Sequence, residues 1–94
     1  MNIRQIQYVF EVARQGCNIS AAAKALHTAQ SGVSKQLKLF EDELGLPLFH
    51  KKGNRLVGLT SAGAIVLDSA RVIVNELARV KNVGLIAKKA TVGN

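Results

Sequence analysis

One stretch of the chain, residues 20–44, restricts the fold more than any other because its apolar residues follow a helical period. In its second half they recur at steps of four, three and four: Val33, Leu37, Phe40 and Leu44. This spacing places them on one face of a helix. The first half is rich in alanine and ends near Leu26, so we expect two helices joined by a tight turn.

The face opposite this apolar stripe predicts contact with an anionic surface. It carries short hydroxyls and long cations without a bulky apolar side chain: Ser31, Ser34, Lys35 and Lys38. The chain has 13 Lys and Arg against 6 Asp and Glu, a formal charge of +7, which favours nucleic acid through phosphate contacts and counterion release. A DNA major groove is wide enough to admit such a helix.

Composition narrows the class of protein further. Ninety-four residues form one small domain. Cys17 is the only cysteine, which excludes an intramolecular disulfide and fits a reducing cytoplasm. No apolar run approaches the roughly 18 residues that span a bilayer. Aromatic residues make up only 4% of the chain, too few for the stacking surfaces that bind single-stranded nucleic acid. We therefore expect a cytoplasmic protein without a membrane segment.

The residues before the third helix predict two shorter helices. Asn2 is a plausible cap for the first, which would stop at the Gln-Gly pair of residues 15–16. Ser20 is positioned to cap the second helix, and Thr28 or a neighbour to cap the third. The inner face of the first helix is expected to hold four residues at helical spacing, with Val9 and Val12 beside them: Ile3, Ile6, Phe10 and Ala13.

After Leu44 the helical pattern ends and a two-stranded wing is expected. Gly45 fits a helix C-cap, and Pro47 prevents continuation. Residues 48–51 and 56–59 are predicted strands, joined by a positively charged turn. The acidic residues 41–43 would lie at the far end of the third helix, away from a phosphate backbone. The predicted fold class is mainly α: a winged helix-turn-helix of three helices and a two-stranded wing over residues 1–59, followed by a long helix.

Residues 60–88 predict this long last helix, with Thr60 as its cap. Its small and apolar residues follow the 3.5-residue period of a helix-on-helix seam: Val66, Ala70, Ile73, Leu77, Val80, Gly84 and Ala87. We expect this helix to pack along a second helix. The alternative is a helix that folds back on its own domain, although that domain is small for so long a stripe. Residues 89–94 have no periodicity and are expected to form a disordered tail.

Catalysis and metal binding are not expected. His27, His50 and Cys17 are scattered along the chain without a short ligand pair. No arrangement of Ser, His and Asp, or of Cys and His, suits nucleophilic catalysis, and no glycine-rich phosphate loop occurs. We therefore predict a protein that is not an enzyme and that uses no metal or cofactor.

Several motifs occur in a familiar order: the first helix at residues 3–13, the run from Ser20 to Gly45, Pro-Leu-Phe at 47–49, and Leu-Thr-Ser-Ala-Gly at 59–63. Through these motifs, residues 3–87 resemble the N-terminal DNA-binding domain of LysR-type transcriptional regulators. Asn18, Thr28 and residues 32–36 and 41–45 are most similar to the CysB-like subgroup, which controls sulfur assimilation.

The resemblance implies a winged helix-turn-helix and a linker helix that pairs in a homodimer on double-stranded DNA. Gln30 matches the family position near the start of the recognition helix, and Ser34 and Lys35 match a family Ser-Arg or Ser-Lys pair. Family members normally continue into an effector-binding domain, often within a tetramer. That domain is missing here, so we expect a shortened chain in which a small-molecule effector would act only through the missing part.

Two positions depart from the family pattern. Ser31 stands where the family usually has proline, and it keeps a backbone N–H and a hydroxyl that could contact phosphate. Lys51 stands where arginine is common, and it keeps the charge but not the planar fork. The candidate DNA-binding residues are Thr28, Gln30, Ser31, Ser34, Lys35, Lys38, Lys51, Lys52 and Arg55. The candidate dimer interface is Val66, Ala70, Ile73, Leu77, Val80 and Gly84.

Two other functions fit parts of the sequence. A non-specific architectural DNA-binding protein would use the same basic face without reading bases. A helix-mediated dimerisation module would use the last helix and leave the basic face incidental.

Overall fold

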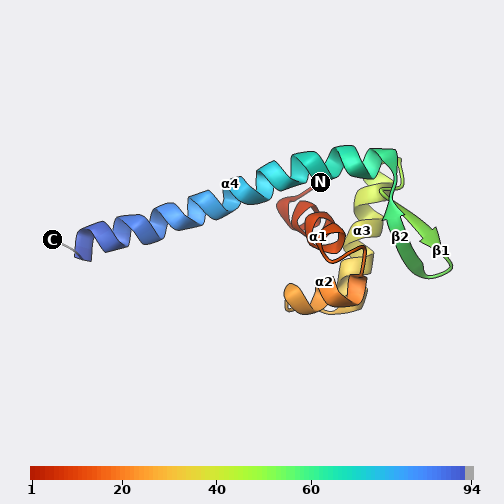
Figure 1. Ribbon diagram of the computed structural model, residues 1–94, viewed down its shortest axis with the longest axis horizontal. Coiled ribbons are helices and arrows are strands. Elements are labelled where there is room, and N and C mark those ends of the chain that lie inside the picture. The colour runs from red at the N-terminus through yellow and green to blue at the C-terminus, as the bar shows by residue number, and fades with distance from the viewer. Residues whose placement is uncertain (93–94) are drawn as a thin grey trace.

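The computed structural model describes the backbone of residues 1–92 and the side chains of residues 1–85 and Ala87. Its elements in chain order are α1 (Ile3–Arg14), α2 (Ile19–Ala25), α3 (Gln30–Leu44), β1 (Phe49–Lys52), β2 (Arg55–Leu59) and α4 (Ser61–Val92). Three helices gather beneath one end of α4, with the wing beside them (Figure 1). The predicted fold class, a mainly α winged helix-turn-helix followed by a long helix, is confirmed.

Helix α1 begins where the sequence predicts but faces the core differently. The Asn2 carboxamide accepts a hydrogen bond from the Gln5 backbone N–H, and the Gln5 side chain accepts one from the Asn2 backbone, which is a capping box. Val9 and Val12 are fully buried, whereas Ile3 is 52% exposed. The predicted inner face was therefore rotated by about one residue. The same apolar residues fit two neighbouring faces, and only the packing of α1 against three other helices selects between them.

The predicted cap of α2 is wrong, whereas the cap of α3, predicted at Thr28 or a neighbour, lies at the neighbour Ala29. Asn18, not Ser20, caps α2 by accepting a hydrogen bond from the Ala21 backbone N–H at 2.9 Å. The N-cap of α3 is Ala29, which has no side-chain cap hydrogen bond, so Thr28 does not cap this helix. Each start follows a turn with a positive φ angle: Cys17, at 64°, directly precedes the cap Asn18, and His27, at 54°, lies two residues before the cap Ala29.

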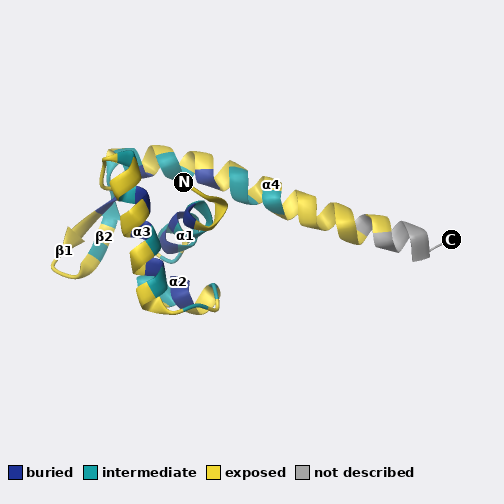
Figure 2. Ribbon diagram, turned by 180° about the vertical axis from the view of Figure 1, so that it is seen from behind, coloured by how far each residue is buried: buried dark blue, intermediate teal, exposed yellow. Residues whose placement is uncertain are grey.

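The core lies where α3 meets the other helices and the base of the wing. Val33, Leu37 and Phe40 form the buried side of α3, as predicted. Two buried alanines on α2, Ala22 and Ala23, let α2 and α3 approach closely because they have little bulk. The other members of the cluster are Val9, Val12, Leu48 and Phe49. This core fixes α3 with one side buried and the opposite side exposed (Figure 2).

The wing is an antiparallel hairpin held to α3 by a carboxylate. Its register pairs Phe49 with Leu59 and Lys52 with Arg55, with an irregularity between His50 and Lys51. The Glu41 carboxylate accepts hydrogen bonds from the backbone N–H of Leu48, at 2.6 Å, and of Phe49. Gly45 ends α3 with a φ of 73°, as the predicted C-cap. Each strand lies within one residue of its predicted position.

Helix α4 begins at a tight junction with the wing. The Thr60 hydroxyl accepts a hydrogen bond from the Gly63 backbone N–H, so the predicted cap is confirmed, and it donates to the Pro47 carbonyl. Gly63 passes so close to the Leu48 carbonyl that a Cβ there would overlap it. Beyond this junction α4 packs along α1 and then extends away from the domain (Figure 1).

Helix α4 is longer than predicted. It extends to Val92, beyond the expected end near residue 88, so a disordered tail from residue 89 is wrong for residues 89–92. The sequence there includes lysine and alanine, which favour helix, and proline is absent, so nothing terminates the helix earlier. Residues 93–94 of the predicted tail lie outside the described residues. Among the described helices, none is long and apolar enough to cross a membrane.

Candidate nucleic-acid interface

The outer side of α3 presents the four residues that the sequence places there. Ser31, Ser34, Lys35 and Lys38 are all exposed, opposite the buried side of the helix. Hydroxyl groups can donate and accept hydrogen bonds, and ammonium groups pair with phosphate. The helix has 15 residues, so this side is long enough to lie in a major groove.

The first residue of α3 meets α2. The Ser20 hydroxyl donates a hydrogen bond to the Gln30 carboxamide oxygen at 2.9 Å. The pair borders a hollow of about 310 Å³ between the α1–α2 turn, the start of α3 and the turn of the wing, where Cys17, Asn54 and Arg55 also lie. Burial raises the pKa of the Cys17 thiol, so this group is neutral at pH 7 and adds no negative charge to the hollow.

Thr28 lies just before α3 and is only partly exposed. Its backbone N–H donates to the Ala23 carbonyl at 3.0 Å, which closes the turn after α2. Thr28 Oγ1 also lies 3.7 Å from the position that a Cβ on Gly32 would occupy. Thr28 is thus packed against the first turn of α3 and has less free surface than the other candidates.

The three cations of the wing are exposed. Lys51 lies toward α3, and the other two lie opposite each other on the hairpin. Lys51 borders a hollow of about 420 Å³ between the wing and α3, which Ser34 and Lys38 also line. Lys52 and Arg55 are directly opposite each other across the hairpin. Like charges at opposite positions destabilise a hairpin. An anionic partner would offset this repulsion.

The acidic residues at the end of α3 do not face away together, as the sequence suggested. Glu41 turns inward to the wing backbone. Glu43 accepts from the Met1 amino group at 2.6 Å. Asp42 remains on the outer side of α3, with a carboxylate oxygen 3.9 Å from the Lys38 ammonium nitrogen. Helical geometry separates consecutive side chains by about 100°, so three adjacent acids cannot share one direction.

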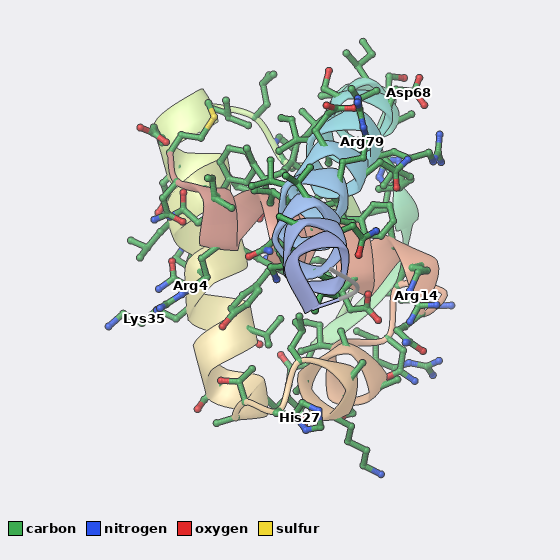
Figure 3. The ribbon with its side chains drawn as sticks, turned by 90° about the vertical axis from the view of Figure 1, so that its left-hand side faces the viewer. Arg4, Arg14, His27, Lys35, Asp68 and Arg79 are labelled. Atoms are coloured by element: carbon green, nitrogen blue, oxygen red, sulfur yellow. The ribbon has the colours of Figure 1, made fainter. Side chains whose placement is uncertain are left out.

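One cation that sequence reasoning missed lies beside this surface. Arg4 of α1 and Lys35 of α3 point to the same side of the molecule (Figure 3). A hydrogen bond of 3.3 Å between the side chains of Gln5 and Gln36 holds the first turn of α1 against the middle of α3. Gln5, which follows Arg4, thus contacts α3 directly. No local sequence pattern predicts it, because the two residues are 31 positions apart.

The six candidate dimer residues on α4 divide into two groups. Ala70 is 2% exposed and lies against α1, and Val66, Ile73 and Leu77 are partly buried in the single chain. Ala70 therefore has almost no surface left for a partner. Val80, at 70%, and Gly84 are exposed. For the first half of the stripe, the single chain shows what the alternative predicted, a helix that packs on its own domain, and the pairing role of the stripe stays a prediction.

A second apolar stripe on α4 faces solvent. Its members are Ile65, Val72, Val80 and Val83, each more than half exposed. At about 100° per residue they fall within roughly a quarter of the helix circumference. This stripe borders the inner side, and residues 78–85, in the part of α4 that extends from the domain, are all exposed (Figure 2).

Within the described residues, no group of three or more His, Cys, Asp or Glu side chains could hold a metal ion. The two histidines, His27 after α2 and His50 on β1, lie on different elements. The side chains that do gather are hydroxyls, amides and cations on α3 and the wing.

Residues 3–64 match the sequence profile described as a bacterial regulatory helix-turn-helix protein of the LysR family. The chain belongs to the LysR family. Among curated LysR-type relatives, it is 45% identical over 84 residues to the HTH-type transcriptional regulator CysB of Burkholderia cenocepacia, covering 89% of the chain and 27% of that protein. It is 39% identical over 93 residues to the HTH-type transcriptional regulator Cbl of Escherichia coli K12, covering 99% of the chain and 29% of that protein.

Solved LysR-family structures share the fold. The CbnR DNA-binding domain, solved as a DNA complex, superposes with a TM-score of 0.77 at 34% identity, covering 93% of this chain and 98% of that one. OxyR from Pseudomonas aeruginosa gives a TM-score of 0.81 at 22% identity, a likeness of fold, over 92% of this chain and 28% of that one. The chain thus spans less than a third of the curated relatives described above.

Proposed function

We propose that the chain is the part of a bacterial transcriptional regulator that binds a specific sequence of double-stranded DNA. The observation that carries this proposal is the outer side of α3, where hydroxyls and lysines stand exposed beside the cationic wing. The relatives named as transcriptional regulators and the CbnR domain in complex with DNA support it. No catalytic step is part of the proposed function.

In this proposal α3 enters the major groove. Gln30, Ser31 and Ser34 at its start contact base edges and nearby phosphates, while Lys35 and Lys38 contact phosphates. Thr28 lies at the border of this surface and contacts the backbone. Lys51, Lys52 and Arg55 place the wing on the flanking minor groove and backbone. Arg4 adds a phosphate contact beside Lys35.

The regulator would bind an inverted repeat as a symmetric homodimer. Two copies of α3 in successive major grooves require half-site centres roughly 34 Å apart, a spacing that the long α4 helices would set. The exposed stripe of Ile65, Val72, Val80 and Val83, with Gly84 beside it, provides the apolar surface for pairing. Val66, Ile73 and Leu77 keep partly exposed surface for this interface, whereas Ala70, at 2% exposure, would contribute little.

Further properties would belong to the remainder of a longer protein. The relatives are more than three times as long as the matched region, so binding of a small-molecule effector and assembly of a tetramer would depend on segments outside this chain. We place the protein in the cytoplasm, where bacterial DNA is accessible. The likeness to CysB and Cbl supports assignment to the CysB-like subgroup.

Selection of bound duplexes from a random pool tests the proposal directly. Enrichment of one motif, repeated with inverted symmetry, is the expected result. Titrations of the selected and a scrambled duplex at several salt concentrations then separate the alternatives. Equal affinity for both duplexes would favour an architectural DNA-binding protein. Absence of binding at low salt would leave the dimerisation module as the remaining function.

A further inference from the structure

The contact between α2 and the first residue of α3 has a consequence for which base the protein reads. Ser20 and Gln30 are ten positions apart, on different helices, and the Ser20 hydroxyl donates to Gln30 Oε1 at 2.9 Å. Both side chains are exposed at the side of α3 that carries Ser34. The hydrogen bond therefore lies at the surface assigned to DNA.

Ser20 is free to make this contact because another residue caps α2. The Asn18 carboxamide satisfies the Ala21 backbone N–H, so the Ser20 hydroxyl is not needed at the helix start. Gln30 is likewise not used as a cap, since Ala29 occupies the N-cap position of α3 without a side-chain hydrogen bond. Each side chain is thus available for the other.

A glutamine amide offers one acceptor oxygen and one donor NH₂ group, and which of them meets a base decides the base chosen. A free glutamine pairs with adenine in a bidentate fashion, accepting from N6–H and donating to N7. In this chain the oxygen already accepts from Ser20. The NH₂ group remains as the principal polar group for DNA, and guanine offers it two acceptors, O6 and N7, on the major-groove edge.

We propose that Ser20 is a specificity-determining positioning residue: by holding Oε1 of Gln30, it makes Gln30 a donor and selects guanine over adenine at the base pair that Gln30 reads. The inference rests on the proposed function of α3 in the major groove. Water competes for the Ser20 hydroxyl in the free protein. Bound DNA would exclude that water and strengthen the hydrogen bond in the less polar interface.

The test compares four chains: the wild type, Ser20→Ala, Ser20→Thr and Gln30→Ala. Ser20→Thr keeps the hydroxyl and is the matched control for Ser20→Ala. Each chain selects duplexes from the same random pool, and pairs of duplexes that differ by guanine or adenine at the affected base pair are then titrated. Thermal melts of all four chains check that these exposed substitutions leave the fold intact.

The expected result is a preference for guanine of at least about fivefold in the wild type and in Ser20→Thr, from the range for one well-made base contact. In Ser20→Ala the preference should disappear or turn toward adenine, while the dependence of affinity on salt stays the same. Gln30→Ala should accept guanine and adenine equally. These results together would establish the coupling between Ser20 and Gln30.

Other outcomes would overturn the inference in distinguishable ways. If Ser20→Ala keeps the wild-type preference while Gln30→Ala loses it, Gln30 reads DNA without Ser20 and the proposed function stands. A wild-type preference for adenine or cytosine would mean that Oε1 faces the base. If Gln30→Ala changes no base preference, Gln30 is not a reading residue. Failure to enrich any motif would remove the proposed sequence-specific function as well.

Discussion

Helices α3 and α4 are both amphipathic, and they differ in what they leave exposed to solvent. The outer side of α3 carries hydroxyls and cations, such as Ser31 and Lys35. Helix α4 carries, next to its buried side, an exposed stripe of aliphatic residues such as Val72 and Val80, at 62% and 70% exposure. The buried side of each helix packs against other elements of the same small domain.

The solvent-facing side of an amphipathic helix is therefore more informative about function than its apolar side. The apolar side of either helix shows only that something covers it, and here the chain itself covers most of it. The solvent-facing side shows the chemistry of a partner. A phosphate backbone suits the outer side of α3, and a second apolar helix suits the exposed stripe of α4.

The largest expected effect concerns the inner side of α4, at its junction with the wing. Gly63→Ala would press a methyl group into the Leu48 carbonyl, and backbone at this point cannot move without disturbing β1. We expect a loss of about 3 kcal/mol in the free energy of unfolding, at the upper end for overpacked sites. Chemical denaturation followed by circular dichroism measures it.

Gly84→Ala is the matched control on the same helix. In the single chain a Cβ at Gly84 meets no atom within 4 Å, so alanine there should stabilise α4 by up to about 1 kcal/mol through helix propensity when measured at a dilution that prevents pairing. Changes of opposite sign in the free energy of unfolding would confirm that the start of α4 is tightly packed against the wing, whereas its extension is not packed in the single chain. Equal effects would contradict that difference between the two ends of α4.

A charge reversal on α3 is expected to have the next largest effect. Lys35→Glu removes one cation from the outer side and adds repulsion toward phosphate, so DNA affinity should fall roughly thirtyfold at moderate salt. Lys81→Glu makes the same change at an exposed position of α4 and should have much less effect. Fluorescence anisotropy with the selected duplex compares them. Comparable losses would mean that net charge alone, without the surface of α3, drives binding.

A single charge on the apolar stripe of α4 should act on pairing alone. Val80→Asp would bury an unpaired carboxylate in the dimer and raise the dimer dissociation constant by at least about tenfold. The side chain is 70% exposed in the single chain, so the melting temperature of the monomer should not change. Analytical ultracentrifugation measures the association.

Asn82→Asp supplies the control for this experiment, because it adds the same charge two residues away on another side of the helix. The asparagine is exposed, and its substitution should leave the dimer intact. A dimer that survives Val80→Asp would place the interface away from this stripe.

Local patterns predicted those parts of the fold that local chemistry determines. Asn2, Gly45 and Thr60 mark element ends through bonds or dihedral angles within a few residues, and all three are confirmed. The cap at Asn18 was not predicted, because it follows a turn in which Cys17 has a positive φ angle, and no local sequence pattern indicates that angle. The freed Ser20 then contacts Gln30.

Tertiary packing decided what the sequence could not. The stripe from Val66 to Gly84 is real, yet its period is the same whether α1 or a second chain covers it. Burial of Ala70 against the domain distinguishes the two for the first half of the helix. Arg4 joins the side of Lys35 because the core packs α1 against α3, where the side chains of Gln5 and Gln36 also meet (Figure 3).

The smallest expected effect is a gain of affinity, and it tests the polar character of the outer side of α3 most finely. Asp42 lies 3.9 Å from the Lys38 ammonium group and brings a negative charge to a surface otherwise suited to phosphate. Asp42→Asn removes this negative charge and should tighten binding about two- to threefold for every duplex. It should leave folding unchanged, because exposed ion pairs of this kind contribute little to stability. Asp68→Asn removes the same charge from α4, beside Arg71, and should leave affinity nearly unchanged. Weaker binding by Asp42→Asn would contradict this expectation. It would show that Asp42 orients the Lys38 ammonium group for its contact with DNA.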